Sequence, residues 1–178
     1  MTQPVAAGRP LAVFRYQLAV VASDMADVVR SAGGWLCDRA RAGWDVNVVV
    51  AGHYDARPLS ILGAVGLDVD GDLSAVVKRA STCAELAISS HVLATDDRFR
   101  ADVFALVKRR LTEVTVWGDD WPDEFGRKVD RVEHKLSSAA HAFKAHALEA
   151  AAAPTSSGTA TETFFNLDVE SSRRLYSV

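Results

Sequence analysis

The first third of the chain alternates between short apolar runs and a stretch with helical spacing. Residues 16–22 and 45–51 are short runs dominated by Val, Ala and Leu, which is typical of strands buried on both faces of a sheet. Over residues 25–40, apolar side chains recur three or four positions apart, the spacing of one helix face. Asp24 suits the N-cap of that helix and Gly43 suits its end. The pattern predicts a strand–helix–strand unit with parallel strands and a right-handed crossover.

Weaker patterns extend this unit along the chain. Residues 65–69 and 113–117 are short apolar runs, and we expect a third and a fourth strand there. Residues 73–111 have helical spacing, with a break and a new helix cap at Thr95. From Pro122 to residue 152 we expect one long final helix with a narrow apolar stripe. The stripe comprises Val129, Val132, Leu136, Ala140, Phe143 and Ala147.

These elements predict an α/β fold of the βαβ, Rossmann-like type with three layers. We expect a mainly parallel sheet of about four strands, a long C-terminal helix and an extended tail. The chain has 178 residues and is 49% hydrophobic, which fits one domain with a buried core. Composition divides it into a flexible arm (residues 1–10), a single α/β domain (residues 11–153), and a linker with a tail (residues 154–178). Within the tail, residues 164–169 are apolar, and we expect this segment to dock on the chain's own core, on a second protomer or on another protein.

Charge and cysteine content narrow the classes of function. The net charge of −3 argues against general nucleic-acid binding, because a domain that relies on phosphate contacts is basic. The first residues lack the charged and apolar regions of a signal peptide, and no early apolar run spans a bilayer. We therefore expect a cytoplasmic protein with no membrane association. Cys37 and Cys83 form no disulfide framework or zinc pattern, so we expect buried, reduced thiols.

Acidic residues follow the expected strands. Asp24 follows the first, His53 and Asp55 follow the second, and Asp119 and Asp120 follow the fourth. Ligands of open parallel sheets bind at the carboxyl ends of the strands. These residues therefore predict a rim on which carboxylates hold Mg²⁺ or Mn²⁺ and a metal or an acid/base pair activates water. The other interpretation is simpler: Asp is favoured where a helix begins, so the acids serve as caps. The pattern leaves both open.

Under the rim hypothesis, the candidate residues have two sets of roles. The catalytic candidates are Asp24, His53, Asp55 and Asp119, and the metal-ligating candidates are Asp24, Asp55, Asp119 and Asp120. A second feature, the pair Gly33 and Gly34, lies inside the first expected helix, where each glycine costs about 1 kcal/mol relative to Ala. No G-x-G-x-x-G motif surrounds it. We expect it to allow close packing of this helix on the sheet or on a second protomer.

Two hypotheses for function follow. No nucleophile elbow, phosphate loop or metal-ligand spacing occurs in the sequence. The first hypothesis is therefore a non-catalytic interaction or regulatory module without a cofactor, which forms a homo-oligomer or binds a protein partner through its last helix and tail. The alternative is a small metal-dependent hydrolase of phosphorylated or nucleotide substrates, which uses the acidic rim and Mg²⁺ or Mn²⁺. Whether the protein is an enzyme stays open at this point.

Overall fold

A computed structural model describes residues 16–68, 72–80, 82–110, 112–119, 129–154 and 159–167. The described strands form one seven-stranded sheet in the order β3-β2-β1-β4-β5-β7-β6. Neighbours from β3 to β5 pair in parallel, whereas β7 pairs antiparallel with both β5 and β6. The strands are β1 (Gln17–Ala22), β2 (Asp45–Val50), β3 (Val65–Gly66), β4 (Glu85–Ser89), β5 (Glu113–Trp117), β6 (Val129–Lys135) and β7 (Thr161–Leu167).

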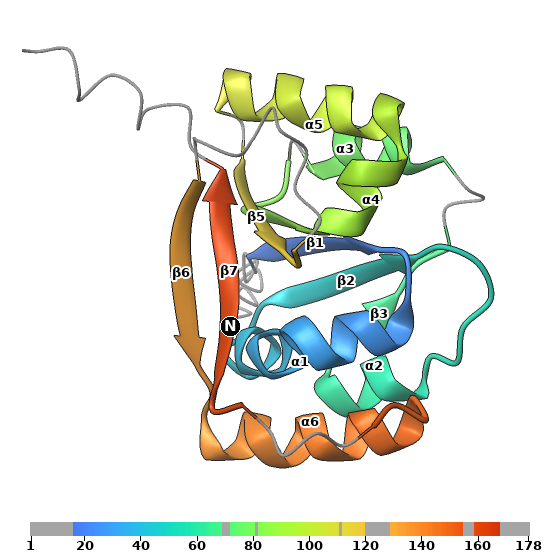
Figure 1. Ribbon diagram of the computed structural model, residues 1–178, viewed down its shortest axis with the longest axis vertical. Helices are drawn as coiled ribbons and strands as arrows, with labels where there is room; N and C mark the ends of the chain where they lie inside the picture. Colours follow the sequence, from blue (N-terminus) through green and yellow to red (C-terminus); the bar gives the residue numbers. More distant parts are fainter. Residues whose placement is uncertain are drawn as a thin grey trace, which may run out of the picture.

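Helices cover both faces of the sheet (Figure 1). The described helices are α1 (Met25–Arg41), α2 (Arg57–Leu62), α3 (Leu73–Ala80), α4 (Ser90–Thr95), α5 (Asp97–Arg109) and α6 (Ser138–Ala150). One hydrophobic core lies between the sheet and α1, α2 and α6, and a second lies between the sheet and α3, α4 and α5. The fold is therefore a mixed α/β fold, and its sheet is larger and less uniformly parallel than the sequence predicts.

The predicted strand–helix–strand unit is confirmed. β1 and β2 pair in parallel, with Gln17 beside Asp45. Asp24 caps α1 by accepting a hydrogen bond from the N–H of Asp27 at 3.0 Å. At the other end, Gly43 follows the helix with a φ of 91°, a left-handed conformation that glycine adopts without strain. In this unit the helix cap, the helical spacing and the terminating glycine that the sequence predicts are all present in the structure.

β4 corrects the prediction that residues 73–111 are helical. Glu85–Ser89 is a strand between β1 and β5, and all five of its residues are buried. A strand buried on both faces has no alternation of polar and apolar residues, so its period does not distinguish it from a buried helix. The predicted break at Thr95 is confirmed, because α4 ends there. The cap is Asp96, whose carboxylate accepts the N–H of Phe99 at 2.9 Å.

The C-terminal third also differs from the prediction. The expected long helix is a strand, β6, followed by the shorter helix α6, and residues 120–128 lie outside the described residues. The expected apolar docking segment is β7, which lies inside the sheet between β5 and β6. The sheet thus continues to Leu167, beyond the domain boundary expected at residue 153. The third strand is Val65–Gly66, shorter than the predicted 65–69, of which residue 69 is not described. The expected arm, residues 1–10, is also outside the described part.

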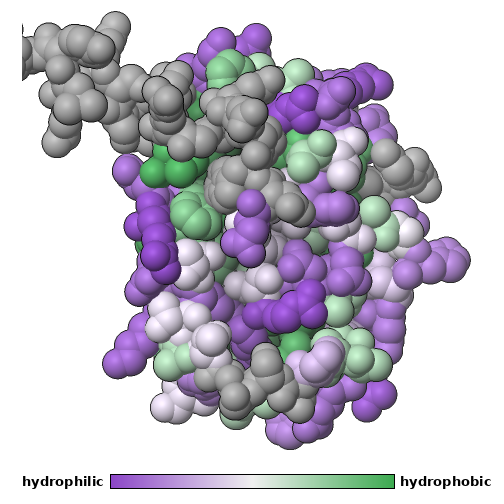
Figure 2. All heavy atoms as spheres, viewed as in Figure 1, coloured by the Kyte–Doolittle hydropathy of each residue, from purple (hydrophilic) through white to green (hydrophobic). Residues whose placement is uncertain are grey.

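The final helix, α6, has one buried face and one exposed face. Ala140 and Ala147 face the core, while Phe143 is partly exposed. On the face in Figure 2, hydrophilic side chains dominate and the hydrophobic ones form separate patches.

In the described residues, no helix combines the length and the apolar character needed to cross a membrane. Cys37 is buried and Cys83 is partly buried, and both are free thiols.

Gly34 is the point of closest packing on α1. A Cβ at this position would collide with the side chain of Leu136, which follows β6. Its N–H also donates to a carboxylate oxygen of Glu162 on β7 at 2.8 Å. At Gly33 an added Cβ would make only ordinary van der Waals contacts. The expectation that the glycine pair allows close packing within the domain is therefore confirmed for Gly34.

Candidate functional site

The carboxyl edge of the parallel strands is where the strand order reverses. From β1 the chain turns first toward β2 and β3, and afterwards toward β4 and β5 on the other side. In an open α/β sheet a ligand usually binds in the crevice beside such a reversal, at the carboxyl ends of the strands. We place the candidate site at this edge.

A cavity of about 230 Å³ opens at this edge, and we call it the carboxyl-edge pocket. It lies between the loop after β1, the loop after β2 and the end of α6. Its polar lining comprises Ser23, Asp24, His53, Tyr54 and Asp55. The structure thus brings together three of the residues predicted from sequence, namely Asp24, His53 and Asp55.

Both acids in the pocket also accept a backbone N–H near the start of a helix, and Asp24 is the N-cap of α1. One oxygen of Asp24 accepts the N–H of Asp27 at 3.0 Å, and one oxygen of Asp55 accepts the N–H of Arg57 at 2.9 Å. Neither carboxylate forms an ion pair within the described part of the chain. The two interpretations of the acids are therefore compatible: each carboxylate accepts a backbone N–H with one oxygen, and both residues line the pocket. His53 lies in the loop after β2, two residues before Asp55, and is exposed.

The remaining predicted acids do not complete the rim. Asp119 follows β5 and does not line the carboxyl-edge pocket, and Asp120 lies outside the described residues. Among the residues that the structure describes, no three His, Cys, Asp or Glu side chains are grouped so as to hold a metal ion. The described donor set does not fit a resident metal, and we derive no chemical step through one.

Sequence reasoning missed the role of Asp27 at the strand-order reversal. Its Oδ2 accepts the indole N–H of Trp117 at 2.9 Å and the hydroxyl of Ser89 at 3.1 Å. Its Oδ1 accepts the hydroxyl of Ser31 at 2.9 Å. Asp27 therefore joins the first turn of α1 to the ends of β4 and β5. Because its oxygens are engaged by these donors, it is a positioning residue rather than a base.

The carboxyl ends of β4 and β5 are tightly packed. Trp117 is fully buried, and Ser90 at the start of α4 is 2% exposed. Gly118 has a φ of 106°, and a Cβ there would collide with the hydroxyl of Ser90. Trp117, Gly118 and Ser90 are therefore tightly packed at the ends of β4 and β5. The carboxyl-edge pocket lies beside β1 and β2 instead.

Comparisons with known proteins identify structural neighbours but no sequence family. No family model matches the chain, and no curated protein sequence matches it. One solved structure with a similar fold is the antimicrobial reagent A40926 pseudoaglycone deacetylase, with a TM-score of 0.56 and 15% identity over 84% of this chain and 96% of that one. A deacetylase–teicoplanin complex has a TM-score of 0.61 and 12% identity over 85% and 98% of the two chains.

A third neighbour is described as the zinc inhibited form of teicoplanin deacetylase, with a TM-score of 0.57 and 11% identity over 84% of this chain and 97% of that one. At these identities the likeness shows the fold alone. It nevertheless corrects the first hypothesis from sequence. The hypothesis of a non-catalytic interaction module rests on missing motifs, whereas the three neighbours named above are described as deacetylases. Short motifs detect only chemistry whose residues are close in sequence, and here the pocket residues come from separate loops. The expected homo-oligomer or protein partner stays a prediction.

Proposed function

We propose that the chain is a small hydrolase that cleaves an acyl–nitrogen bond with water in the carboxyl-edge pocket. The observation that carries the proposal is the convergence of Asp24, His53 and Asp55 on one pocket at the strand ends. The deacetylases that share the fold support amide cleavage as the type of reaction. We also propose that the parallel part of the sheet is Rossmann-like. The reversal of strand order at β1 supports this classification.

The lining of the pocket favours an amide over a phosphorylated substrate. No Lys or Arg is among its described lining residues, so no lysine or arginine side chain there offsets the charge of a phosphate. The two carboxylates would repel a phosphate group. A neutral amide carbonyl carries no such penalty. The phosphorylated or nucleotide substrates expected from sequence are therefore replaced by acylated amines.

His53 is the proposed general base. Histidine is the side chain best suited to accept and return a proton near neutral pH. In the proposed reaction, water adds to the carbonyl carbon and its proton moves to the imidazole of His53. The same proton then moves to the leaving nitrogen as the carbon–nitrogen bond breaks, which yields a carboxylic acid and an amine, and the acid then loses its proton to solvent. The carboxylates of Asp24 and Asp55 stabilise the imidazolium that forms between these two steps.

The beginning of α1 supplies donors for the developing oxyanion. The N–H groups of the first helical turn have no partner four residues earlier. Asp24 takes up only that of Asp27 with its side chain. The N–H groups of Met25 and Ala26 remain, and Met25 lines the pocket. Backbone donors at a helix N-terminus stabilise negative charge, which accumulates on the carbonyl oxygen during attack.

The test is an assay of amine release from a panel of N-acetylated substrates, with a fluorescent amine reagent. We expect His53→Gln to lower kcat/KM by about 100-fold or more, as for loss of a general base, and Asp24→Asn to lower it less. His146→Gln, on the exposed face of α6, is the matched control and keeps the parent rate. Thermal denaturation verifies that each variant is folded. If no N-acetylated substrate is turned over, or if His53→Gln retains the parent rate, the proposal fails.

Metal dependence is tested in the same assay with a chelator and with added Mg²⁺, Mn²⁺ or Zn²⁺. We expect activity to survive the chelator, because the proposed roles use only side chains and backbone. Loss of activity with the chelator and recovery with one of these ions would overturn the role given to His53 as the base that activates water.

A further inference from the structure

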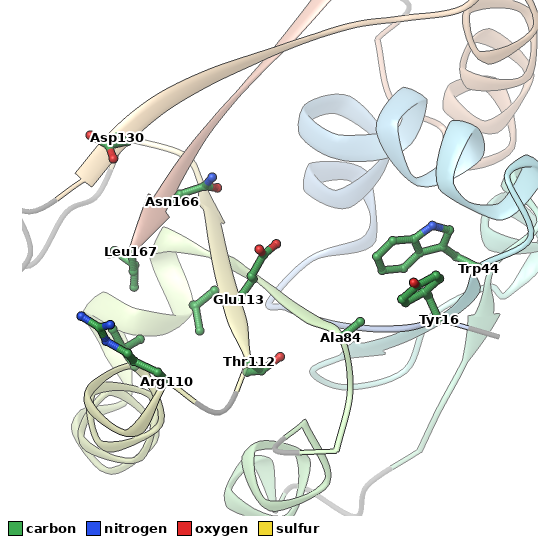
Figure 3. Close-up of a pocket in the computed structure, with 11 residues that line it drawn as sticks. Tyr16, Trp44, Ala84, Arg110, Thr112, Glu113, Asp130, Asn166 and Leu167 are labelled. Atoms are coloured by element: carbon green, nitrogen blue, oxygen red, sulfur yellow. The ribbon is translucent and has the colours of Figure 1, made fainter. Parts of the chain in front are cut away.

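A second and larger cavity lies at the opposite edge of the sheet. Its volume is about 590 Å³, and we call it the amino-edge pocket (Figure 3). Residues that precede β1, β2, β4 and β5 line it together with residues from β6 and β7. The lining residues that matter here are Tyr16, Trp44, Arg110, Glu113, Asp130 and Asn166. The pocket shares no described lining residue with the carboxyl-edge pocket, so it is a separate cavity.

An aromatic wall bounds one side of this pocket. The rings of Tyr16 and Trp44 are stacked, with centroids 5.1 Å apart and planes at 27°. The guanidinium carbon of Arg39 lies 4.3 Å from the ring centroid of Trp44. The wall therefore already holds one cation. Tyr16 is 66% exposed, which is unusual for a large aromatic side chain stacked on another, and its ring remains available to a ligand.

Carboxylates supply negative charge on the other sides. Glu113 projects from β5 into the space between Asn166 and the aromatic wall, and Asp130 lies at the rim where β6 begins (Figure 3). Within the described residues, neither carboxylate forms an ion pair. Arg110 is also in the lining and interacts with another group. Among the described lining residues the two carboxylates outnumber this one cation, so this part of the lining carries a net negative charge.

Behind the wall, Glu85 and Arg39 neutralise each other. Oε2 of Glu85 lies 3.0 Å from Nη2 of Arg39, and the carboxylate of Glu85 is almost completely buried. Burial raises the pKa of Glu85; Arg39 and Thr115 oppose this effect, and the charge of Glu113 adds to it. Because Arg39 is already paired, it is not available to neutralise Glu113. The charge of Glu113 is therefore left for a ligand.

We propose that the amino-edge pocket binds a small organic cation with a primary amine. The ammonium group is held by the carboxylate of Glu113 and the amide oxygen of Asn166, and its alkyl or ring stem packs on Tyr16. Asp130 attracts the cation at the rim. An aromatic face beside a carboxylate that forms no ion pair in the described residues is a combination that recognises ammonium groups, even where the ring is exposed to solvent. The proposal stands without the hydrolase proposal, since the two pockets share no residue.

Calorimetric titration at low ionic strength with cadaverine tests this site. The matched probe is 1,5-pentanediol, which has the same carbon chain with hydroxyls in place of the amines. We expect saturable binding of cadaverine that weakens with added salt, and no binding of the diol. Glu113→Gln and Tyr16→Ala each weaken cadaverine binding about tenfold. Glu149→Gln, a carboxylate change on exposed α6, and His53→Gln both bind like the parent, which separates this site from the proposed catalytic one.

Three outcomes would overturn the assignment. The first is no saturable binding of cadaverine to the folded parent protein. The second is equal binding of the diol, which would indicate a site for neutral polar ligands. The third is parent-like affinity in folded Glu113→Gln, which would place the cation elsewhere. Thermal denaturation of each variant shows that the comparison concerns folded protein.

Discussion

Lys144 and Glu162 form a buried ion pair that reaches into the middle of α1. Nζ of Lys144 lies 2.6 Å from Oε1 of Glu162, and the two side chains are 7% and 1% exposed. The same ammonium donates to the carbonyl oxygen of Arg30 at 2.7 Å. The carboxylate accepts the N–H groups of Gly34 and Trp35 at 2.8 and 2.7 Å. The pair therefore supplies partners to backbone groups inside a helix and joins α6 and β7 to α1.

This arrangement predicts how the pair responds to substitution. Lys144→Met leaves the carboxylate of Glu162 buried and without its counter-ion, so we expect a loss of about 3 kcal/mol in unfolding free energy. Many buried ion pairs can be replaced by two apolar residues without loss. Here Lys144→Met with Glu162→Leu should not recover stability, because the N–H groups of Gly34 and Trp35 lose their acceptor at about 1–3 kcal/mol each.

Urea denaturation at neutral pH measures both variants. Glu149→Gln, on the exposed part of the same helix, is the control and should stay within about 0.5 kcal/mol of the parent. A double variant as stable as the parent would show that Glu162 does not support the backbone of α1.

The two adjacent glycines of α1 should respond in opposite ways to alanine. At Gly33 a Cβ would lie 3.5 Å from side-chain atoms of Leu62 and Val29, an ordinary contact. Gly33→Ala should therefore stabilise the protein by about 0.5–1 kcal/mol, since Ala is the better helix former. At Gly34 a Cβ would overlap Leu136, so Gly34→Ala should destabilise it by about 2–3 kcal/mol.

Thermal and urea denaturation compare the two variants directly. In a Leu136→Ala background, Gly34→Ala should cost less, because the side chain that it displaces is shorter. Equal stability of Gly33→Ala and Gly34→Ala would show that Leu136 does not pack over Gly34.

The sequence predicts those parts of the fold whose signals are local. β1, α1 and β2 follow from a cap, a helical period and a glycine end within about 35 residues, in line with the length of a strand–helix–strand unit. β4 and β6 escape detection for opposite reasons. β4 is buried on both faces and lacks alternation, whereas β6 is largely exposed, and its Val129 and Val132 happen to continue the apolar spacing of α6. Both strands are defined by partners distant in the chain.

The sequence predicts some residues of the candidate site and misses others. Asp24, His53 and Asp55 follow from the rule that ligands bind at carboxyl ends, because that rule needs no strand order. The role of Asp27 depends on β4 lying beside β1, which sequence alone does not reveal. One signal was available: a buried indole needs an acceptor, and Trp117 ends a strand. That rule does not predict the amino-edge pocket, because it concerns only the carboxyl ends of the strands.

The contact between Asp27 and Trp117 should be measurable as a coupling energy. Asp27→Ala leaves the buried indole N–H without an acceptor, so we expect a loss of about 2 kcal/mol. Trp117→Phe removes that donor. In the Trp117→Phe background, Asp27→Ala should therefore cost about 1 kcal/mol less, and the cycle of four proteins isolates this difference. Strictly additive losses in urea denaturation would show that the hydrogen bond contributes nothing to stability.

The buried carboxyl of Glu85 should make stability depend on pH with a defined sign. Burial raises its pKa in the folded state, and Arg39 and Thr115 only partly oppose this. An unfolded Glu has a pKa of about 4.3. Between that value and the raised folded pKa, the folded protein binds more protons than the unfolded chain. The contribution of Glu85 is therefore fully present below about pH 4.3 and falls as the pH rises through the folded pKa.

Glu85→Gln removes this titration, and the difference in unfolding free energy from the parent isolates it. As the pH rises from about 4.3 through the folded pKa of Glu85, we expect the unfolding free energy of Glu85→Gln to increase steadily relative to that of the parent. Above the folded pKa this difference should level off. Because the charge of Glu113 adds to the raised pKa, Glu113→Gln in the parent should narrow the range over which the shift occurs. Urea denaturation at a series of pH values measures both effects. A difference that stays constant with pH, or that shifts toward the parent, would mean that burial does not raise the pKa of Glu85.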